Sequence, residues 1–276
     1  MSTALDGVRI GFLGAGAMAE ALAGGLRASG IPAPSLRLSD PDPARRKHVE
    51  QALGLTTTDD NAALVAASDL VVLAVKPQVV PGALAALTRE PDLARPLWVS
   101  IAAGIRIARL EAALGAGARV VRAMPNTPAL VRSGATAICG NAAANAEDLS
   151  RARTLFESVG TCWTAPREAL LDAVTGLSGS GPAYVFVFLE ALGDAGVRMG
   201  LPRDAAYQLA FQTVLGAAKL AIEDGRHPAA LKDQVTSPGG TTIAGLERLE
   251  AAGFRAALYD AVAAATRRSE ELARGE

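Results

Sequence analysis

The stretch VRIGFLGAGAMA, residues 8–19, determines the class of fold. Its first six residues predict a buried strand, and the small residues after them predict a tight turn into a helix over residues 17–29. Gly14 allows the turn, Gly16 lets the backbone approach a pyrophosphate, and Ala19 permits close packing of the helix against the strand. Unpaired N–H groups at the helix start attract phosphate charge. The stretch therefore predicts a dinucleotide-binding loop rather than a plain glycine turn.

The rest of the first 165 residues alternates short apolar runs with helical patterns. The expected strands cover residues 8–13, 36–39, 70–75, 97–101, 119–123, 135–139 and 161–164. They are rich in leucine and β-branched residues and do not alternate with polar residues, which is typical of buried parallel strands. A helix over residues 43–53 is expected, with Asp42 as its N-cap and Pro43 at its first position. The order predicts an α/β Rossmann domain, a doubly wound and mostly parallel sheet.

From Pro166 onward the strand patterns stop and alanine-rich helical patterns follow, which predicts an all-α domain. A helix is expected over residues 202–224. Residues 182–197 suit either a strand or a helix, and their length and alanine-rich continuation favour the helix. Because that helix is apolar nearly all round, it must be buried on most sides, which indicates a partner subunit. The expected domains are residues 1–165 and 166–276.

Composition and charge argue against several classes of protein. The 276 residues carry 27 basic and 28 acidic side chains, without the basic excess of a nucleic-acid or membrane surface. The N-terminal residues lack a charged leader followed by an apolar stretch, and no apolar run reaches the ~20 residues of a membrane span. Cys139 and Cys162 occur without a CxxC motif or a histidine nearby. We therefore expect a cytoplasmic protein with two free thiols and no metal site.

Polar and small residues follow the expected strands, at the edge where such sheets bind ligands. Asp40 stands 21 residues after Ala19, where a carboxylate holds the ribose 2′-hydroxyl of NADH and repels the 2′-phosphate of NADPH. The basic residues 45–47 could instead pair with that phosphate or form a solvated helix face, so both cofactors stay open. Lys76 points toward the cofactor or serves as a linker.

Two later strand ends also suit the nicotinamide half of a cofactor. Small residues over 100–104 would let a flat ring approach the backbone. Asn126 could bind ribose or carboxamide, although asparagine beside proline is also ordinary turn chemistry.

The helical half contains an unusual string, DQVTSPGGTT, over residues 233–242. Two hydroxyl side chains precede a Pro-Gly-Gly turn and two follow it, where a helix begins. Exposed N–H groups and hydroxyl donors suit a small carboxylate. A helix cap needs a single hydroxyl, so the surplus favours binding over capping. The turn over residues 176–182 is a hinge or faces the site, and His227 is expected to have a structural or surface role.

Together these strings resemble the pyrroline-5-carboxylate reductase family, the last enzymes of proline biosynthesis. The resemblance covers essentially the full length, through the Gly14 loop, AVKP at 74–77, RAMPNTP at 122–128, SGSGPAY at 178–184, HP at 227–228, LKD at 231–233 and SPGGTT at 237–242. It implies a Rossmann domain followed by a helical dimerisation domain with interlocking helices, and dimers able to assemble further. It also implies reduction of (S)-1-pyrroline-5-carboxylate to L-proline with NADPH or NADH.

The resemblance also implies roles for individual residues. The pyrophosphate would lie at Gly14, Gly16, Ala17, Met18 and Ala19, the adenosine ribose at Ser39 and Asp40, and the adenine near Asn61. The nicotinamide side would comprise Ala74, Val75, Lys76 and Pro77, to which the strand ends add Ala102, Ala103 and Asn126. Ser237 and the backbone of Gly239 and Gly240 would bind the substrate carboxylate, and Thr241 would also contact the substrate. Thr242, the expected catalytic residue, would contact the ring nitrogen. Asp40 stands where many relatives carry a neutral residue.

These site residues fit hydride transfer to a protonated imine, which needs alignment rather than a strong nucleophile or a metal. Two alternatives remain. A hydroxy-acid dehydrogenase would need a lysine or histidine aimed at the substrate hydroxyl, for which Lys232 is the only candidate. A regulatory nucleotide-binding module would keep the Gly14 loop but have no use for the hydroxyl-rich string.

Overall fold

The computed structural model describes residues 3–87 and 92–274, which form two compact units. One unit holds the chain up to Gly179 together with the last helix from Ala265 onward, and the other spans Ser180–Ala264. Met1 and Ser2, part of the N-terminal stretch in which no leader is predicted, lie outside the described residues. The domain limits expected from the sequence, 1–165 and 166–276, stay a prediction.

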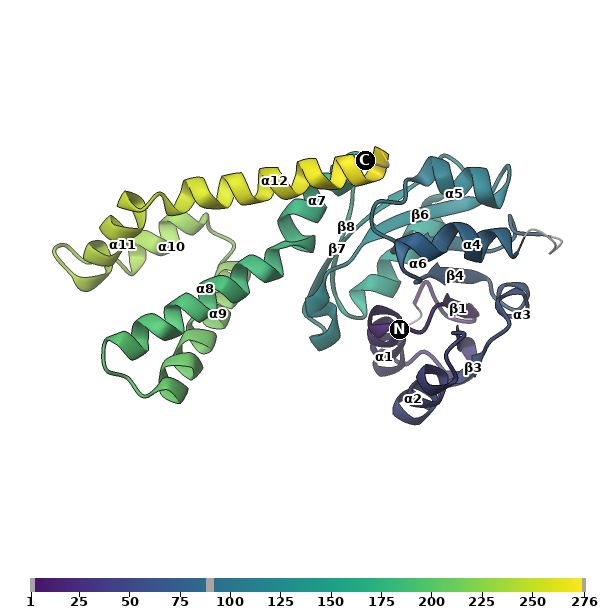
Figure 1. Ribbon diagram of the computed structural model, residues 1–276, viewed down its shortest axis with the longest axis horizontal. Helices are drawn as coiled ribbons and strands as arrows, with labels where there is room; N and C mark the ends of the chain where they lie inside the picture. The colour runs from purple at the N-terminus through teal and green to yellow at the C-terminus, as the bar shows by residue number, and fades with distance from the viewer. Residues whose placement is uncertain (1–2, 88–91, 275–276) are drawn as a thin grey trace. The chain divides into compact units, whose positions relative to one another are not determined.

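Within the described residues, the first unit is built on a single eight-stranded sheet (Figure 1). The strands are β1 (Ile10–Leu13), β2 (Leu36–Ser39), β3 (Thr56–Thr58), β4 (Leu70–Leu73), β5 (Leu97–Ser100), β6 (Arg119–Met124), β7 (Gly134–Gly140) and β8 (Gly160–Thr164). Their order is β3-β2-β1-β4-β5-β6-β7-β8, and only the β6–β7 pair among them is antiparallel. The predicted doubly wound, mostly parallel sheet is confirmed.

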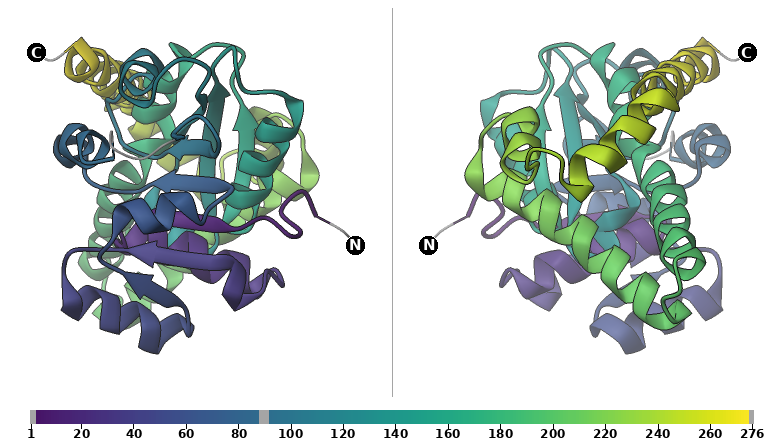
Figure 2. Two further views of the ribbon diagram at one scale, coloured as in Figure 1. Left: turned by 90° about the vertical axis from the view of Figure 1, so that its right-hand side faces the viewer. Right: turned by 90° about the vertical axis from the view of Figure 1, so that its left-hand side faces the viewer.

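Helices cover both faces of this sheet (Figure 2). They are α1 (Ala17–Ala28), α2 (Pro43–Leu53), α3 (Asn61–Ala66), α4 (Val80–Ala85), α5 (Ile107–Leu114), α6 (Ala146–Glu157) and α7 (Leu170–Val174), with short turns η1 (Ala33–Ser35), η2 (Pro77–Val79), η3 (Thr127–Val131) and the π-helical η4 (Thr175–Gly179). Strand β4 shows why its pattern does not alternate with polar residues. Leu70 and Val72 belong to the core cluster that includes residues of α1, α2 and α6, while Val71 and Leu73 belong to the cluster that includes residues of α3, α4, α5 and α7.

Several element limits differ from the sequence expectation by one or two residues. Val8 and Arg9 precede β1, and β4 ends at Leu73 because the next residues form the loop at the sheet edge. Strand β3 was not expected, since its three threonines carry no apolar signal. It forms because it pairs with β2 in parallel register.

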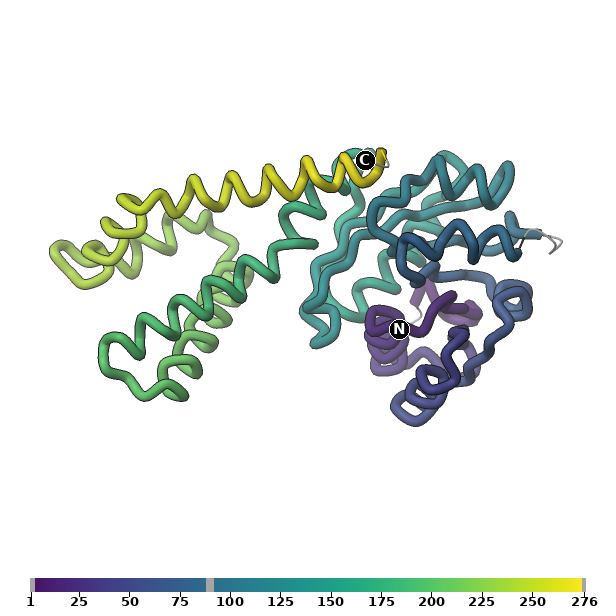
Figure 3. Tube along the Cα trace, in the orientation of Figure 1, coloured from purple at the N-terminus to yellow at the C-terminus, as the bar shows by residue number. Residues whose placement is uncertain are grey.

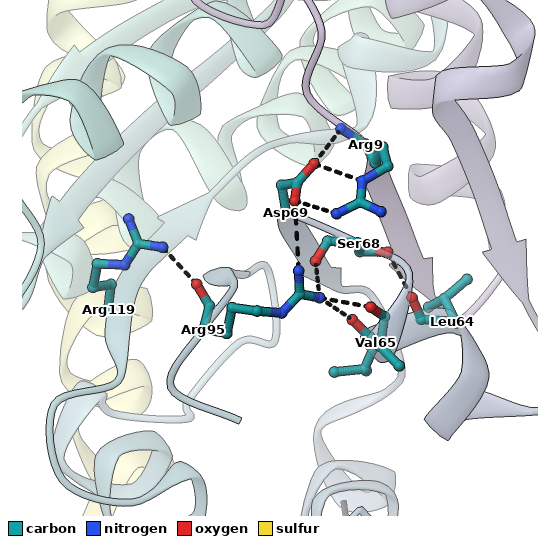
Figure 4. A network of polar contacts seen from close by, with 8 residues as sticks. Arg9, Leu64, Val65, Ser68, Asp69, Arg95 and Arg119 are labelled. Carbon is teal, nitrogen blue, oxygen red and sulfur yellow. Dashed lines mark hydrogen bonds and ion pairs between the residues drawn. The ribbon is translucent and has the colours of Figure 1, made fainter. Parts of the chain in front are cut away.

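An ion-pair network joins the amino ends of four strands (Figure 4). The Asp69 carboxylate accepts from the Arg9 guanidinium at 2.6 and 2.8 Å and lies 3.6 Å from Arg95. Arg95 also donates to the carbonyl oxygens of Ala66 and Ser68, at 2.7 and 2.8 Å, and so caps the end of α3. Its own carbonyl accepts from Arg119, the first residue of β6, at 2.7 Å. Asp69 therefore stabilises the amino-terminal edge of the sheet, which is opposite the edge that carries the Gly14 loop.

Replacing Asp69 by asparagine is expected to lower the free energy of unfolding by about 1 kcal/mol at pH 7, since the pairs are partly exposed. The hydrogen bond from Arg9 lowers the pKa of Asp69 from 3.8 to about 2. A lowered pKa in the folded state gives stability that is present above pH 4 and is lost as the pH falls toward 2. The variant should therefore lose less stability than the wild type over that range. Urea titrations at pH 7 and pH 3 measure both effects, and Asp59→Asn, an exposed carboxylate with one 3.5 Å ion pair, is the control.

The second unit is entirely helical within its described residues. It comprises α8 (Gly181–Arg198), α9 (Arg203–Asp224), α10 (Pro228–Gln234), α11 (Thr241–Ala251) and the first part of α12 (Phe254–Arg274). Residues 182–197 form a helix, as expected, and α8 lies side by side with α9 (Figure 3). A Cβ at Gly193 would come within 3.0 Å of the Tyr207 ring, so the glycine permits this close approach. His227 caps α10 by accepting from the Ala229 N–H, which confirms its structural role.

Large apolar side chains of this unit face outward. On α8, Phe186 and Val187 are 65% and 66% exposed, and Ile222 on α9 and Tyr259 on α12 are 82% and 76% exposed. A single chain rarely leaves so many apolar side chains uncovered on one helical unit. None of the helices in the described residues has the length and apolar character that a membrane crossing requires.

Candidate active site

The predicted dinucleotide loop lies at the switch point of the sheet. Strands β3, β2, β1, β4, β5 and β6 are parallel, so their carboxyl ends share one edge. The chain leaves β1 between β2 on one side and β4 on the other, where the Gly14 N–H donates to the Ser39 carbonyl at 2.9 Å and the Ala74 N–H to the Leu13 carbonyl at 2.8 Å. Open α/β sheets bind their ligands at this point.

Gly14 and Gly16 differ in what surrounds them. Gly14 has φ +101°, and a Cβ there would lie 2.9 Å from the Ala74 carbonyl oxygen, so the turn admits no side chain. Gly16 is the N-cap of α1 without a side-chain hydrogen bond, and a Cβ there would meet nothing within 4 Å. The first N–H groups of the helix, including those of Ala17 and Met18, have no partners within the helix. This open cradle before a helix start fits a pyrophosphate.

The expected adenosine residues lie at the ends of β2 and β3. Ser39 is buried, and its hydroxyl donates to the Phe12 carbonyl at 3.5 Å. Asp40 follows it and accepts from the Ala15 N–H at 3.1 Å, so its carboxylate lies against the Gly14 loop. Asn61 begins α3 beyond the end of β3 and is partly exposed. Ala19, in the first turn of α1, is fully buried.

The residues expected on the nicotinamide side follow β4, β5 and β6. Ala74 and Val75 form the loop after β4, with exposed Lys76 before the short η2 turn that Pro77 begins. Ala102 is buried and Ala103 exposed in the loop after β5.

Asn126, which follows β6, is 8% exposed and uses both ends of its amide internally. Its Nδ2 donates to the Ser178 carbonyl at 3.0 Å, and its Oδ1 accepts from the Ala135 N–H at 2.9 Å. The structure thus gives Asn126 a role in joining the loop after β6 to β7 and to η4, and its contact with a cofactor stays a prediction.

Two buried ion clusters behind this edge were not expected from the sequence. Arg122 on β6 is 2% exposed and donates to Glu168 at 2.8 Å, and the same Glu168 oxygen accepts from the first N–H of α5. Asp172 on α7, also 2% exposed, accepts from Arg106 at 2.6 Å and from Ser269 at 2.8 Å. Both clusters hold the segment between Ala102 and α5. Their members are far apart in sequence, so no local motif marks them.

The hydroxyl-rich string surrounds the start of α11 in the second unit. Thr236 donates to the Lys232 carbonyl at 2.7 Å, so this hydroxyl is used within the fold. The hydroxyls of Ser237, Thr241 and Thr242 have no hydrogen-bond partner among residues 3–87 and 92–274. Gly240 is the N-cap of α11 and receives no side-chain hydrogen bond. These hydroxyls therefore do not cap the helix, contrary to the alternative that the sequence left open.

The backbone of the string keeps its hydroxyls close to the helix start. Gly239 has φ +67°, a left-handed conformation that turns the chain into α11. A Cβ at Gly240 would lie 2.3 Å from the Ser237 Oγ, so that hydroxyl lies directly against the glycine backbone. Hydroxyl donors and unpaired N–H groups together can bind a small carboxylate.

The remaining lysine, cysteine and metal-ligand candidates have less structural support than the Gly14 loop and the hydroxyl-rich string. Lys232 forms a 2.5 Å ion pair with Asp233, which engages the one lysine that a hydroxy-acid dehydrogenase could have used. Cys139 and Cys162 are free thiols, and burial raises the pKa of the Cys162 thiol to about 11. The described part of the chain contains no group of three or more histidine, cysteine, aspartate or glutamate side chains arranged to hold a metal ion.

A Rossmann sheet with this loop at its switch point defines a dinucleotide-binding protein of the NAD(P)-dependent oxidoreductase class. Residues 9–104 match a family described as NADP oxidoreductase coenzyme F420-dependent, and residues 168–272 match pyrroline-5-carboxylate reductase dimerisation. The chain is 48% identical over 269 residues to pyrroline-5-carboxylate reductase of Pisum sativum, with 97% of each chain covered. The chain belongs to the pyrroline-5-carboxylate reductase family, which confirms the resemblance.

Solved structures agree with this assignment. A pyrroline-5-carboxylate reductase from Coxiella burnetii superposes with a TM-score of 0.91 at 35% identity, covering 96% of this chain and 98% of that one. The Plasmodium falciparum pyrroline carboxylate reductase with NADP bound has a TM-score of 0.85 at 33% identity, with the same coverage. Similarity over the full length decides against a hydroxy-acid dehydrogenase and against a regulatory module.

Proposed function

We propose that this protein reduces (S)-1-pyrroline-5-carboxylate to L-proline, the last step of proline biosynthesis, with the substrate held at the start of α11. The observation that carries the substrate site is the group of three hydroxyls, on Ser237, Thr241 and Thr242, that have no partner among the described residues beside an uncapped helix start. A hydroxyl can both donate and accept, so hydroxyls that the fold leaves unused in so small a region suit a polar ligand.

The chain's residues have separate roles in this proposal. Bound NAD(P)H supplies the hydride, and its pyrophosphate is held by the backbone from Gly14 to Ala19. Ser237, the Gly239 N–H and the first N–H groups of α11 after Gly240 bind the substrate carboxylate, with Thr241 at the same helix start. The Thr242 hydroxyl oxygen accepts a hydrogen bond from the protonated ring nitrogen and fixes the imine carbon in position. Since the protonated imine is already electrophilic, the site needs alignment more than a strong base.

The decisive experiment follows the loss of NAD(P)H absorbance after addition of pyrroline-5-carboxylate, with NADH and NADPH tested side by side. The matched control substrate is 1-pyrroline, which has the same imine ring without the carboxylate. We expect turnover of the carboxylate substrate and a much higher KM for 1-pyrroline. No turnover with either cofactor would contradict the proposed activity, and equal KM values would contradict the carboxylate site.

We also propose that two copies of the chain form a homodimer through the second unit, and that dimers can assemble further. The family match over residues 168–272 names dimerisation, and the outward-facing Phe186, Val187, Ile222 and Tyr259 supply apolar surface for it. We further propose a cytoplasmic location, where free thiols such as Cys139 and Cys162 stay reduced.

Sedimentation tests the assembly. The wild type is expected to sediment as a dimer or larger at micromolar concentration, and Phe186→Glu should shift it toward the monomer because a charge would be buried in the interface. Val131→Glu, which alters an exposed apolar side chain of the other unit, should leave the sedimentation unchanged. A wild type that stays monomeric would contradict the proposal.

A further inference from the structure

The carboxylate of Asp40 is fixed by two backbone groups at the adenosine end of the proposed cofactor site. Its Oδ2 accepts from the Ala15 N–H at 3.1 Å, and its Oδ1 accepts from the Asp42 N–H at 3.0 Å. Each carboxylate oxygen can accept two hydrogen bonds, so both retain a lone pair. Asp40 therefore presents a fixed negative charge and free acceptor positions next to the Gly14 loop.

The two arginines that could offset this charge are engaged elsewhere. Arg45 donates through Nε to the Ala15 carbonyl and through Nη2 to Glu20, and His48 lies 3.1 Å from the other Glu20 oxygen. The Arg45 guanidinium thus lies in an ion pair on α1 rather than at the end of β2.

Arg46 is held by backbone and by a different carboxylate. Its Nη1 donates to the Asp40 carbonyl at 2.7 Å and to the Pro41 carbonyl at 3.2 Å, and its Nη2 lies 3.5 Å from Asp59. It bonds the Asp40 backbone and not the Asp40 side chain. Of the three basic residues over 45–47, only Lys47 lacks a partner among the described residues, and it is exposed.

We infer that this chain selects NADH over NADPH, with Asp40 as the residue that determines the choice. The inference rests on the proposed function, since it assumes that the dinucleotide lies at the Gly14 loop. The ribose hydroxyls of NADH can donate to the free acceptor positions of Asp40, which is the role of an acidic residue at the end of the second strand. A 2′-phosphate would bring acceptor oxygens and negative charge to the same carboxylate. Such charge repulsion disfavours the binding of NADPH.

Binding without turnover tests this inference. Nicotinamide fluorescence titrations would give the Kd of NADH and of NADPH for the wild type, for Asp40→Asn and for Asp42→Asn. We expect the wild type to bind NADH at least about tenfold more tightly, because the ribose hydrogen bonds involve a charged group. Asp40→Asn should reduce this ratio by about tenfold or reverse it. Asp42→Asn removes the same charge two residues away and keeps the N-cap of α2, so it should preserve the ratio.

Four results would overturn the inference. The first is a wild type that binds NADPH as tightly as NADH, in particular if Lys47→Ala then weakens NADPH alone. The second is that Asp40→Asn and Asp42→Asn change the ratio of NADH to NADPH affinity equally, which would show that the effect comes from the net charge of the region and not from Asp40 itself. The third is that neither cofactor binds, which would refute the dinucleotide site of the proposed function as well. Pyrroline-5-carboxylate reduction with no preference for NADH would refute the inference alone.

Discussion

A Gly14→Ala protein is expected to bind NADH and NADPH about a hundredfold more weakly than the wild type, the size of loss that a displacement of about 1 Å at a binding site can cause. The alanine Cβ would lie 2.9 Å from the Ala74 carbonyl oxygen and 3.0 Å from the Val75 Cγ1. Backbone cannot yield as a flexible side chain can, so the loops after β1 and β4 must move apart. That movement displaces the N–H groups that would hold the pyrophosphate, since the same loop leads directly into α1.

The matched control separates this displacement from backbone strain. Gly30 has φ +96°, close to the +101° of Gly14, but a Cβ there would meet nothing within 4 Å. Gly30→Ala should therefore carry the same strain of roughly 1–3 kcal/mol in stability while binding both cofactors normally. Fluorescence titration measures the binding, and thermal unfolding shows that each variant is folded. A folded Gly14→Ala protein with wild-type affinity would place the dinucleotide elsewhere.

The elements of the sheet could be predicted because their signals are local. Asp42 and Pro43 mark the start of α2, and the Asp42 carboxylate does cap it by accepting from the Ala44 N–H. The apolar runs of β1 and β4 are uniform because both faces of each strand are covered. β3 was not predicted, because its three threonines form a strand only through pairing with β2.

Some parts of the candidate site could likewise be predicted from local sequence, and other parts could not. The Gly14 loop and the string before α11 are continuous in sequence, so their residue types and spacing are visible there. The buried Asp172 joins Arg106, 66 positions earlier, to Ser269, 97 positions later, and only the folded chain brings these three together. Asn126 shows the opposite limit, because its sequence context suited both a ligand and a turn, whereas its amide joins the loop after β6 to β7 and η4.

Thr242→Val is expected to lower kcat/KM for pyrroline-5-carboxylate by about 10- to 150-fold. Valine keeps the shape of threonine, and the Thr242 hydroxyl has no partner among the described residues, so its removal breaks no internal hydrogen bond. Only the proposed bond to the substrate nitrogen is lost, and a hydrogen bond to a charged group contributes roughly 1.5–3 kcal/mol. Cofactor affinity should hardly change, because the Gly14 loop belongs to the other unit. Thr213→Val, an exposed position on α9, is the matched control and should keep wild-type kinetics.

Ser237→Ala should change a different kinetic constant, and this contrast tests the two roles against each other. A carboxylate is held alike in the ground state and in the transition state, so loss of its anchor raises KM and leaves kcat nearly unchanged. The Thr242 bond to the ring nitrogen also holds the imine carbon in line for hydride transfer, so Thr242→Val should lower kcat as well through lost alignment. Steady-state kinetics of both variants, with cofactor binding followed by fluorescence, gives the comparison. Wild-type kinetics in both would show that the hydroxyls beside α11 do not contact the substrate, even though the Gly14 loop still binds the cofactor.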